Sequence, residues 1–366
     1  MINLQTNILN YYKTLFFAVL LIIAGCTESN IHPDRNRKIS EKGLFIINEG
    51  NFGSGNASLS YYEPDSCRVT NDIYLSANNI PVGDVPQSMI IKDSLAYVSV
   101  SNSGKIVFFN INDFKHSGTI GGLFAPRYML PFRDSLMLVS DLYKKSIDIV
   151  NVNTLKIVDN IPVGGAVEQM VMHRNFIYAA SWSFNDKLYK INIGEMRVID
   201  SISTGLQPNS MVIDKHKNIW VLCDGGYPGN DAGHEKARLL RIEPASFEII
   251  SDFEFPDLSS SPTELSINSA EDTLYFIGGS WGNENSDIYG IFRMPITDKQ
   301  LPREAFIPGE GHLFYGLGID PANSDVYCSD AIDYLQKGMV FRFNSEGDKI
   351  DSFRAGLVPG YFAFTR

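Results

Sequence analysis

A four-residue phrase that recurs along the chain constrains the fold more than any other feature of the sequence. Pro-x-x-Met occurs at 86–89, 126–129 and 208–211, and variants of it occur at 167–170, 262–265, 314–317 and 359–362. Each phrase opens a short apolar strand, and successive phrases are 40 to 54 residues apart. A repeat of this length indicates an array of similar supersecondary units.

Each repeat contains three further strands after the one that the phrase opens. In the repeat that begins at 126–129, the later strands are expected at 136–139, 146–152 and 161–164. Four short strands in 40 to 50 residues are typical of a propeller blade. A four-stranded sheet cannot bury both of its faces alone, so the blades must pack around an axis. No segment has an amphipathic helical period over three turns, and we therefore expect an all-β fold.

The two ends of the chain supply the parts of one further blade. Only one strand follows the last phrase, and residues 44–82 contain three strands without an opening phrase, at 44–47, 57–62 and 67–75. Joining them leaves no open sheet edge at the seam of the ring. We predict a seven-bladed β-propeller over 43–366, closed by the N-terminal strands and the C-terminal strand. Six or eight blades remain open, because the repeats between 211 and 317 are long.

The N-terminus has the pattern of an export signal. Lys13 precedes an apolar run at 15–24, which is too short for a comfortable transmembrane helix but suits a signal-peptide core. Ile23-Ala24-Gly25-Cys26 resembles a bacterial lipobox, in which the cysteine is acylated. We therefore expect a signal peptide at 1–25, a lipidated Cys26 and a polar tether at 26–42. An ordinary signal peptide followed by a coincidental cysteine is the alternative.

Charge and cysteine content exclude some classes of function. The chain has 31 Lys and Arg against 42 Asp and Glu, a formal net charge of −11. Binding to a nucleic-acid backbone needs a basic face, so no nucleic-acid partner is expected. The spacing of Cys67, Cys223 and Cys328 fits no metal motif, and we interpret all three as small buried side chains within strands.

One end of the predicted channel collects an unusual set of side chains. In a propeller, the loops that enter the first strand and leave the second strand of each blade converge on one face. Here those loops are rich in aromatic residues, which favours a large, flat, partly apolar ligand. The alternative is that the rings only seal the blade tips. The predicted ligand contacts are Phe52, Arg127, Tyr128, Tyr143, Trp182, Tyr227, Trp281, Tyr315 and Tyr334.

Catalytic motifs are missing from the sequence. There is no Gly-x-Ser-x-Gly elbow, His-Glu-x-x-His, Cys-x-x-Cys or P-loop, and the Gly-rich stretch 50–55 joins two strands without opening a helix. We expect no enzyme, no catalytic residues, no required cofactor and no resident metal. Two hypotheses remain open. Carboxylates from Glu49, Glu168 and Glu264 could pair across the channel. Calcium could be held by the Asp- and Asn-rich loops 224–235 and 278–287.

The sequence Leu44-Phe-Ile-Ile-Asn-Glu-Gly-Asn-Phe-Gly-Ser-Gly-Asn-Ala-Ser-Leu-Ser-Tyr-Tyr62 resembles the opening of the YncE-like propeller lipoproteins of Bacteroidetes. The Pro-x-x-Met repeats extend the resemblance over residues 43–366. This group includes the BtuG-type seven-bladed surface lipoproteins. The resemblance implies that the chain binds cobalamin or a related corrinoid and passes it to a BtuB-type TonB-dependent transporter. It also implies that the chain is lipid-anchored in the outer membrane, facing the cell surface. An aromatic face with polar neighbours suits a corrin ring, whose rim carries amides.

Two other classes of function compete with corrinoid capture. A glycan- or protein-binding propeller of the envelope would have an equally aromatic face, because sugars also stack on rings. A lactonase-like or quinoprotein enzyme would share the fold. Three Trp are few for a quinoprotein, whereas Glu49, Asn209 and Asp330 could imitate the metal cluster of a lactonase.

Overall fold

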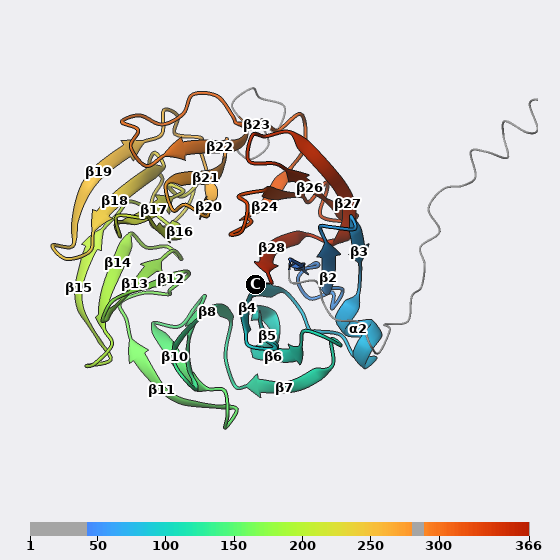
Figure 1. Cartoon of the computed structure of the whole chain (residues 1–366). Coiled ribbons are helices and arrows are strands. Elements are labelled where there is room, and N and C mark those ends of the chain that lie inside the picture. The colour runs from blue at the N-terminus through green and yellow to red at the C-terminus, as the bar shows by residue number, and fades with distance from the viewer. Residues whose placement is uncertain (1–41, 280–288, 366) are drawn as a thin grey trace, which may run out of the picture. The chain divides into compact units, whose positions relative to one another are not determined.

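The computed structural model describes residues 42–279 and 289–365. They form seven four-stranded antiparallel sheets arranged as blades around a central axis (Figure 1). The expected seven-bladed β-propeller is therefore confirmed. The signal peptide at 1–25, Cys26, nearly all of the predicted tether, Trp281 and most of the loop 278–287 lie outside the described residues. Among the described residues, no helix has the length and apolar character needed to span a bilayer.

The ring-closing blade combines the two ends of the chain, as predicted. Its strands, from the axis outward, are β28 (Pro359–Phe364), β1 (Leu44–Asn48), β2 (Ser58–Glu63) and β3 (Arg68–Thr70). Strand β28 pairs antiparallel with β1, so that Phe45 lies opposite Ala363. Gly43 and Thr365 add a further pair of backbone and side-chain hydrogen bonds beyond the strands. Residues more than 300 positions apart thus close the ring.

The other six blades run in chain order, each from its inner to its outer strand. The second blade is β4 (Pro86–Lys92), β5 (Leu95–Val100), β6 (Lys105–Asn110) and β7 (His116–Gly121), and the third is β8 (Pro126–Arg133), β9 (Leu136–Asp141), β10 (Ser146–Asn151) and β11 (Lys156–Pro162). The fourth is β12 (Met170–His173), β13 (Phe176–Ser181), β14 (Lys187–Asn192) and β15 (Arg197–Ser203), and the fifth is β16 (Pro208–Ile213), β17 (Ile219–Cys223), β18 (Arg238–Glu243) and β19 (Glu248–Glu254). The sixth is β20 (Thr263–Ile267), β21 (Thr273–Gly278), β22 (Gly290–Pro295) and β23 (Ile307–Pro308), and the seventh is β24 (Phe314–Ile319), β25 (Val326–Asp330), β26 (Lys337–Phe343) and β27 (Lys349–Leu357). A short 3₁₀ turn, η1 (Ser101–Ser103), follows β5.

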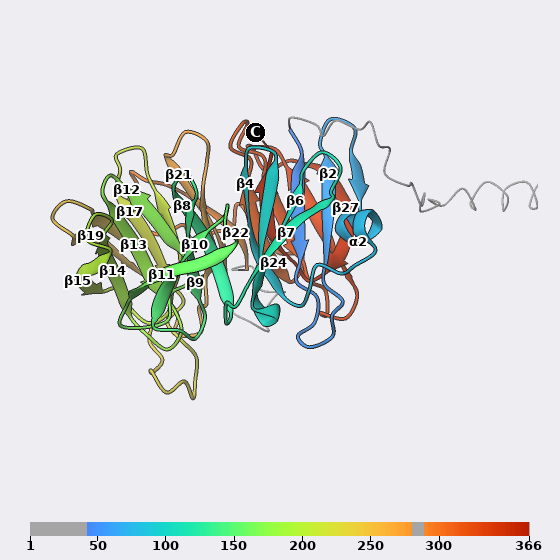
Figure 2. The ribbon, with the colours of Figure 1, turned by 90° about the horizontal axis from the view of Figure 1, so that it is seen from below.

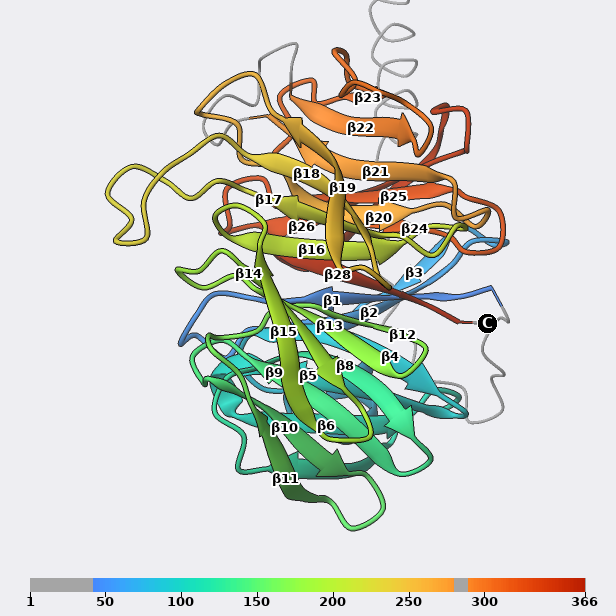
Figure 3. The same ribbon diagram turned by 90° about the vertical axis from the view of Figure 1, so that its left-hand side faces the viewer.

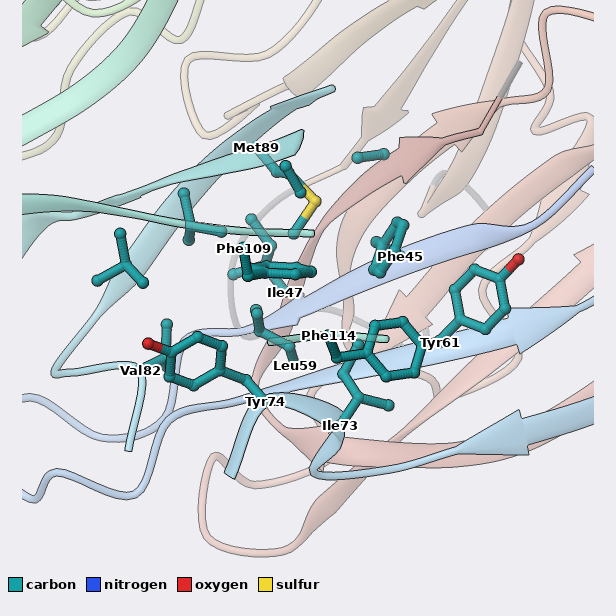
Figure 4. Packing of buried hydrophobic residues seen from close by; sticks show 14 of the residues in the cluster. Phe45, Ile47, Leu59, Tyr61, Ile73, Tyr74, Val82, Met89, Phe109 and Phe114 are labelled. Carbon is teal, nitrogen blue, oxygen red and sulfur yellow. The ribbon is translucent and has the colours of Figure 1, made fainter. Parts of the chain in front are cut away.

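The third N-terminal strand is shorter than the sequence predicts. The expectation was a strand at 67–75, but β3 ends at Thr70 and residues 73–78 form the helix α2 (Ile73–Asn78). The buried side chains of α2 are Ile73, Tyr74 and Ala77, a helical spacing that turns one face toward the core. Figure 4 shows Ile73 and Tyr74 among the apolar side chains that this blade shares with the next. Six residues are too few for the period to be recognised in the sequence.

The cysteines behave differently from one another. Cys223 and Cys328 are fully buried within strands, as expected. Cys67 is exposed, which contradicts the expectation that all three are buried. It occupies the turn between β2 and β3, with a positive φ of 49°, and its side chain faces solvent there because the residue belongs to neither strand. The three described thiols are free.

The last residue of the recurring phrase is an anchor between blades. In all seven blades this Met, Leu or Phe is buried, at 2 to 8% exposure. The anchors are Met89, Met129, Met170, Met211, Leu265, Leu317 and Phe362. Several of them join apolar clusters that span two neighbouring blades: Met211, for instance, packs with Tyr178 of the preceding blade. Burial of this apolar surface is the main force that holds neighbouring blades together.

A β-bulge recurs where the phrase begins. In six of the seven blades the register between the inner strand and its neighbour shifts within or beside the phrase, for example between Pro86 and Ser88 and between Pro208 and Ser210. A bulge places two residues opposite one and redirects the side chains beside it. The phrase can therefore send its anchor into the core and an earlier residue toward the channel.

Candidate functional site

The channel opens into a cavity of about 320 Å³ at the end where the inner strands begin. The first variable residue of the phrase, directly before the bulge or within it, lines this cavity in every blade. These residues are Gln87, Arg127, Glu168, Asn209, Thr263, Tyr315 and Gly360. The second variable residue contributes from three blades, as Tyr128, Glu264 and Tyr361. One register position of the repeat therefore supplies half of the residues that line the cavity.

Three further side chains, Glu49, Trp182 and Asp224, enter from the loops that leave second strands. Glu49, after β1, occupies the space beside Gly360, where any Cβ would collide with its carboxylate. Trp182, after β13, donates from Nε1 to Oδ2 of Asp224, after β17, at 2.9 Å. The same carboxylate accepts the backbone N–H of Gly226. These contacts fix the positions of Glu49 and Trp182 at the cavity wall.

Arg127 is the hub of the polar network. Its Nε donates to both carboxylate oxygens of Glu168, at 2.9 and 3.0 Å, and a terminal nitrogen reaches Oε1 at 2.5 Å. Another terminal nitrogen donates to Oε1 of Gln87. Gln87 in turn donates to Glu49 at 3.3 Å, and the hydroxyl of Tyr315 donates to the other oxygen of Glu49 at 3.0 Å. The network joins the ring-closing blade to four others.

The electrostatics of the cavity favour protonated carboxyl groups. Burial raises the pKa of Glu49 to about 7, against the opposing effects of Arg127 and of its hydrogen bonds. Burial also raises the pKa of Glu264 to about 8, with additional repulsion from Glu49 and Glu168. Burial alone would lower the pKa of Arg127, but the Glu168 carboxylate outweighs it and raises that pKa. Arg127 and Glu168 thus form an ion pair while Glu264 is mostly neutral at pH 7.

Exposed apolar side chains surround the mouth of the cavity. They belong to loops of five blades that project from the same end as the cavity: Phe52, Phe124, Tyr143, Phe184, Tyr227 and Leu335, which we call the rim. Each rim side chain is between 51 and 78% exposed. Figure 2 shows the loops after β1 and β17 projecting from one end, and in Figure 3 the β17–β18 loop extends beyond its neighbours. Scattered surface hydrophobics are ordinary, but a group of them around a cavity makes this face the candidate binding surface.

The structure gathers most of the predicted contact residues at this face. Arg127, Tyr128, Trp182 and Tyr315 line the cavity itself. Tyr334 packs edge-on against Tyr315, with ring centroids 5.8 Å apart. Phe52, Tyr143 and Tyr227 belong to the rim instead of the cavity, and Trp281 lies outside the described residues.

The described residues support neither the lactonase-like metal cluster nor a calcium site. Glu49 and Asn209 line the cavity, but Asp330 is held elsewhere by His312 Nδ1, at 2.7 Å, and by the backbone N–H groups of its own loops. Within 42–279 and 289–365, no group of three or more His, Cys, Asp or Glu side chains could hold a metal ion. In the loop 224–235, Asp224 is occupied by Trp182 and Gly226.

The sequence predicted the cavity glutamates only as one open hypothesis, and it did not include Tyr361 or Asp224 among the ligand contacts. Most of these residues could have been found from the repeat. The position after the first residue of the phrase varies freely in size and charge, whereas the anchor two residues later stays apolar. A position that varies within a strict repeat faces something other than the shared core. Asp224 and Glu49 come from loops, for which the repeat gives no such signal.

Comparison with known proteins identifies the family. A family model described as "Domain of unknown function (DUF5074)" matches residues 42–362. The chain belongs to this family. None of the curated proteins matches it.

Solved structures with the same fold are distant in sequence. A quinonprotein alcohol dehydrogenase-like protein from Bacteroides thetaiotaomicron aligns with a TM-score of 0.67 at 13% identity, covering 90% of this chain and 80% of that one. A protein from Lactobacillus plantarum aligns with a TM-score of 0.63 at 10% identity, covering 89% of this chain and 99% of that one. The dihydro-heme d1 dehydrogenase NirN aligns at 0.62 and 9% identity, covering 90% and 77%. At these identities the likeness establishes the propeller fold and nothing about chemistry.

Proposed function

We propose that this propeller is a non-enzymatic ligand-binding protein of the cell envelope that captures cobalamin or a related corrinoid. The observation that carries the proposal is the ring of exposed apolar side chains around a cavity lined by Tyr, Trp and hydrogen-bonding groups. A flat macrocycle with an amide-bearing edge needs both an apolar surface and convergent polar groups. The resemblance of residues 44–62 to the YncE-like lipoproteins points to the same class of ligand.

The size of the cavity fixes how such a ligand would bind. A corrinoid, with its macrocycle and nucleotide tail, is too large to enter about 320 Å³. In this proposal the macrocycle lies across the rim, in contact with Phe52, Tyr143 and Tyr227, and only one substituent enters the cavity. Trp182 and Tyr315 then contact that substituent from opposite sides of the network.

Delivery and location are part of the same proposal. Acylation of Cys26 would hold the propeller at the outer membrane, and residues 27–42 would serve as its tether. The bound corrinoid would pass to a BtuB-type TonB-dependent transporter beside it. Replacing Cys26 with Ser should abolish incorporation of radiolabelled palmitate and release the protein from membranes, and a variant that stays lipidated would contradict the anchor.

Calorimetric titration of residues 27–366 with cyanocobalamin tests the proposed function. Tight one-to-one binding is expected. No detectable heat at any temperature, together with no spectral change of the corrinoid, would remove corrinoids as the ligand of this chain. The same titration with envelope glycans would then examine the second class of ligand, whose sugars also stack on aromatic side chains.

A further inference from the structure

The cavity holds more acidic groups than its one cation can neutralise. Glu49, Glu168, Glu264 and Asp224 line it together with a single basic side chain, Arg127. That cation is already engaged, because its guanidinium donates to both oxygens of Glu168 and to Gln87. The remaining carboxyl groups therefore have no basic side chain of their own within the lining.

Glu264 is the group without a protein partner. Its carboxyl makes no hydrogen bond or ion pair within the described residues, and neither does the nearby hydroxyl of Tyr361. Glu264 is partly buried in the cavity wall, so its carboxyl is shielded by the protein yet remains accessible to a ligand group that enters the cavity. Glu264 also has a φ of 59°, a left-handed backbone conformation that costs energy for a glutamate.

Aromatic rings form much of the remaining wall. Tyr128 and Tyr361 pack edge-to-face with centroids 6.3 Å apart, and Trp182, Phe314 and Tyr315 complete the lining. The face of an aromatic ring attracts a cation, and Trp and Tyr do so most strongly. Aromatic walls with an unpartnered carboxyl between them are the arrangement that holds organic ammonium groups.

We infer that the cavity binds an organic cation, a compound with an ammonium group, against the Glu264 carboxylate and the surrounding aromatic rings. The inference rests on the proposed function only in taking this face as the ligand-binding face. The amides on the edge of a corrin ring are neutral, so the cation is a ligand separate from the corrinoid. A neutral group of the same shape would gain nothing from ionisation of Glu264.

Binding of a cation would be coupled to release of a proton. With a pKa of about 8, Glu264 is mostly protonated at neutral pH, and an arriving positive charge would favour its ionised form. Affinity for the cation should therefore increase from pH 6 to pH 8.5. A neutral ligand that accepts a hydrogen bond from the protonated carboxyl would show the opposite trend. The titratable or charged groups that line the cavity are Glu49, Arg127, Tyr128, Glu168, Asp224, Glu264, Tyr315 and Tyr361.

The experiment compares choline with its uncharged isostere, 3,3-dimethylbutan-1-ol. The closed ring lies within residues 42–365, so residues 27–366 are used. Binding is followed by saturation-transfer NMR and by tryptophan fluorescence, with Trp182→Phe identifying the part of the signal that comes from Trp182. Choline should bind and the alcohol should not, with choline affinity about tenfold or more higher at pH 8.5 than at pH 6. Equal binding of both compounds, binding of neither, or displacement of choline by millimolar Ca²⁺ but not by tetramethylammonium would overturn the inference.

Glu264→Gln and Glu248→Gln provide the matched pair of variants. The first removes the unpartnered carboxyl, and the second removes an exposed carboxyl of the outer strand β19 with the same change in charge. Glu264→Gln should abolish the pH dependence and weaken choline binding, whereas Glu248→Gln should change neither. A Glu264→Gln protein that keeps the wild-type pH trend would refute the role of this residue. Choline binding without cyanocobalamin binding would contradict the corrinoid proposal alone, and the reverse result would contradict the cation site alone.

Discussion

Arg127 and Glu168, from consecutive blades, form a bidentate ion pair across the channel wall, with Nε at 2.9 and 3.0 Å from the two carboxylate oxygens. Both side chains are largely shielded from water, with 15 and 6% of their surface exposed. Breaking such a pair leaves one charge without compensation, which is far more costly than the loss of a surface pair.

Arg127→Ala should therefore lower the free energy of unfolding by about 3 to 5 kcal/mol, measured by urea denaturation. The control is Lys217→Ala, which breaks an ion pair with Glu271 whose side chains are 51 and 46% exposed and which should cost less than about 1 kcal/mol. Replacing both partners, as Arg127→Met with Glu168→Leu, should recover most of the loss. Equal losses for the two single variants would show that burial does not govern the Arg127 pair.

Stability should decrease as the pH rises. The pKa values of Glu49 and Glu264 are raised by burial to about 7 and about 8, so the folded state holds protons that the unfolded chain has released. This contribution to stability is complete below about pH 4.5 and is lost as the pH passes through 7 and 8. Thermal unfolding between pH 5 and pH 9 should show the decline, and Glu264→Gln should flatten its upper part. An unchanged profile in that variant would mean that Glu264 is already ionised at neutral pH.

Trp182→Ala should weaken cyanocobalamin binding while leaving the fold intact. Loss of one well-packed aromatic contact typically costs about 2 kcal/mol, or roughly thirtyfold in affinity, which calorimetry resolves. Trp182→Phe keeps a ring but removes the donor to Asp224, and should have an intermediate effect. Ile250→Ala, on the outer strand β19 and 50% exposed, should leave the affinity unchanged. The sequence predicts the same loss for Trp281→Ala. Normal binding by the Trp182 and Trp281 alanine variants would place the ligand on another face.

The thiols should react in two classes. Burial raises the pKa of Cys223 and Cys328, and both lie within strands, so neither should react quickly in the native protein. Cys67 is exposed in its turn. A thiol reagent added to residues 27–366 should therefore modify one cysteine rapidly and all three after denaturation. Cys67→Ser should abolish the rapid phase, and a rapid phase that persists would mean that the β17 or β25 region opens readily.

The fold could be predicted because equivalent positions in successive repeats lie in the same structural environment. Each Met89-type anchor meets the same environment between two blades, so its apolar character recurs and is visible without any alignment. Helix α2 could not be predicted, because six residues show less than two turns of a period. The exposure of Cys67 depends on where β3 begins, and strand ends are the least visible part of a sequence pattern.

The sequence predicts which residues lie at the candidate site, but it does not predict which of them contact one another. The loops that converge on the channel follow from the order of strands, and they correctly include Arg127, Trp182 and Tyr315. The partner of each group depends on distances across the ring. The engagement of Arg127 with Glu168, which leaves Glu264 without a cation, depends on the curvature of the channel and on the bulges beside Arg127 and Glu264, neither of which a sequence reveals.

The pairing of β28 with β1 has a consequence for how the chain acquires its structure. Contacts such as that between Phe45 and Ala363 join residues at opposite ends of the propeller, so they can form only after the ribosome has added the last strand. Until then β1 presents an unpaired apolar edge, a form prone to aggregation. The slow search for so distant a contact also makes the closing step a natural candidate for the rate-limiting event of folding.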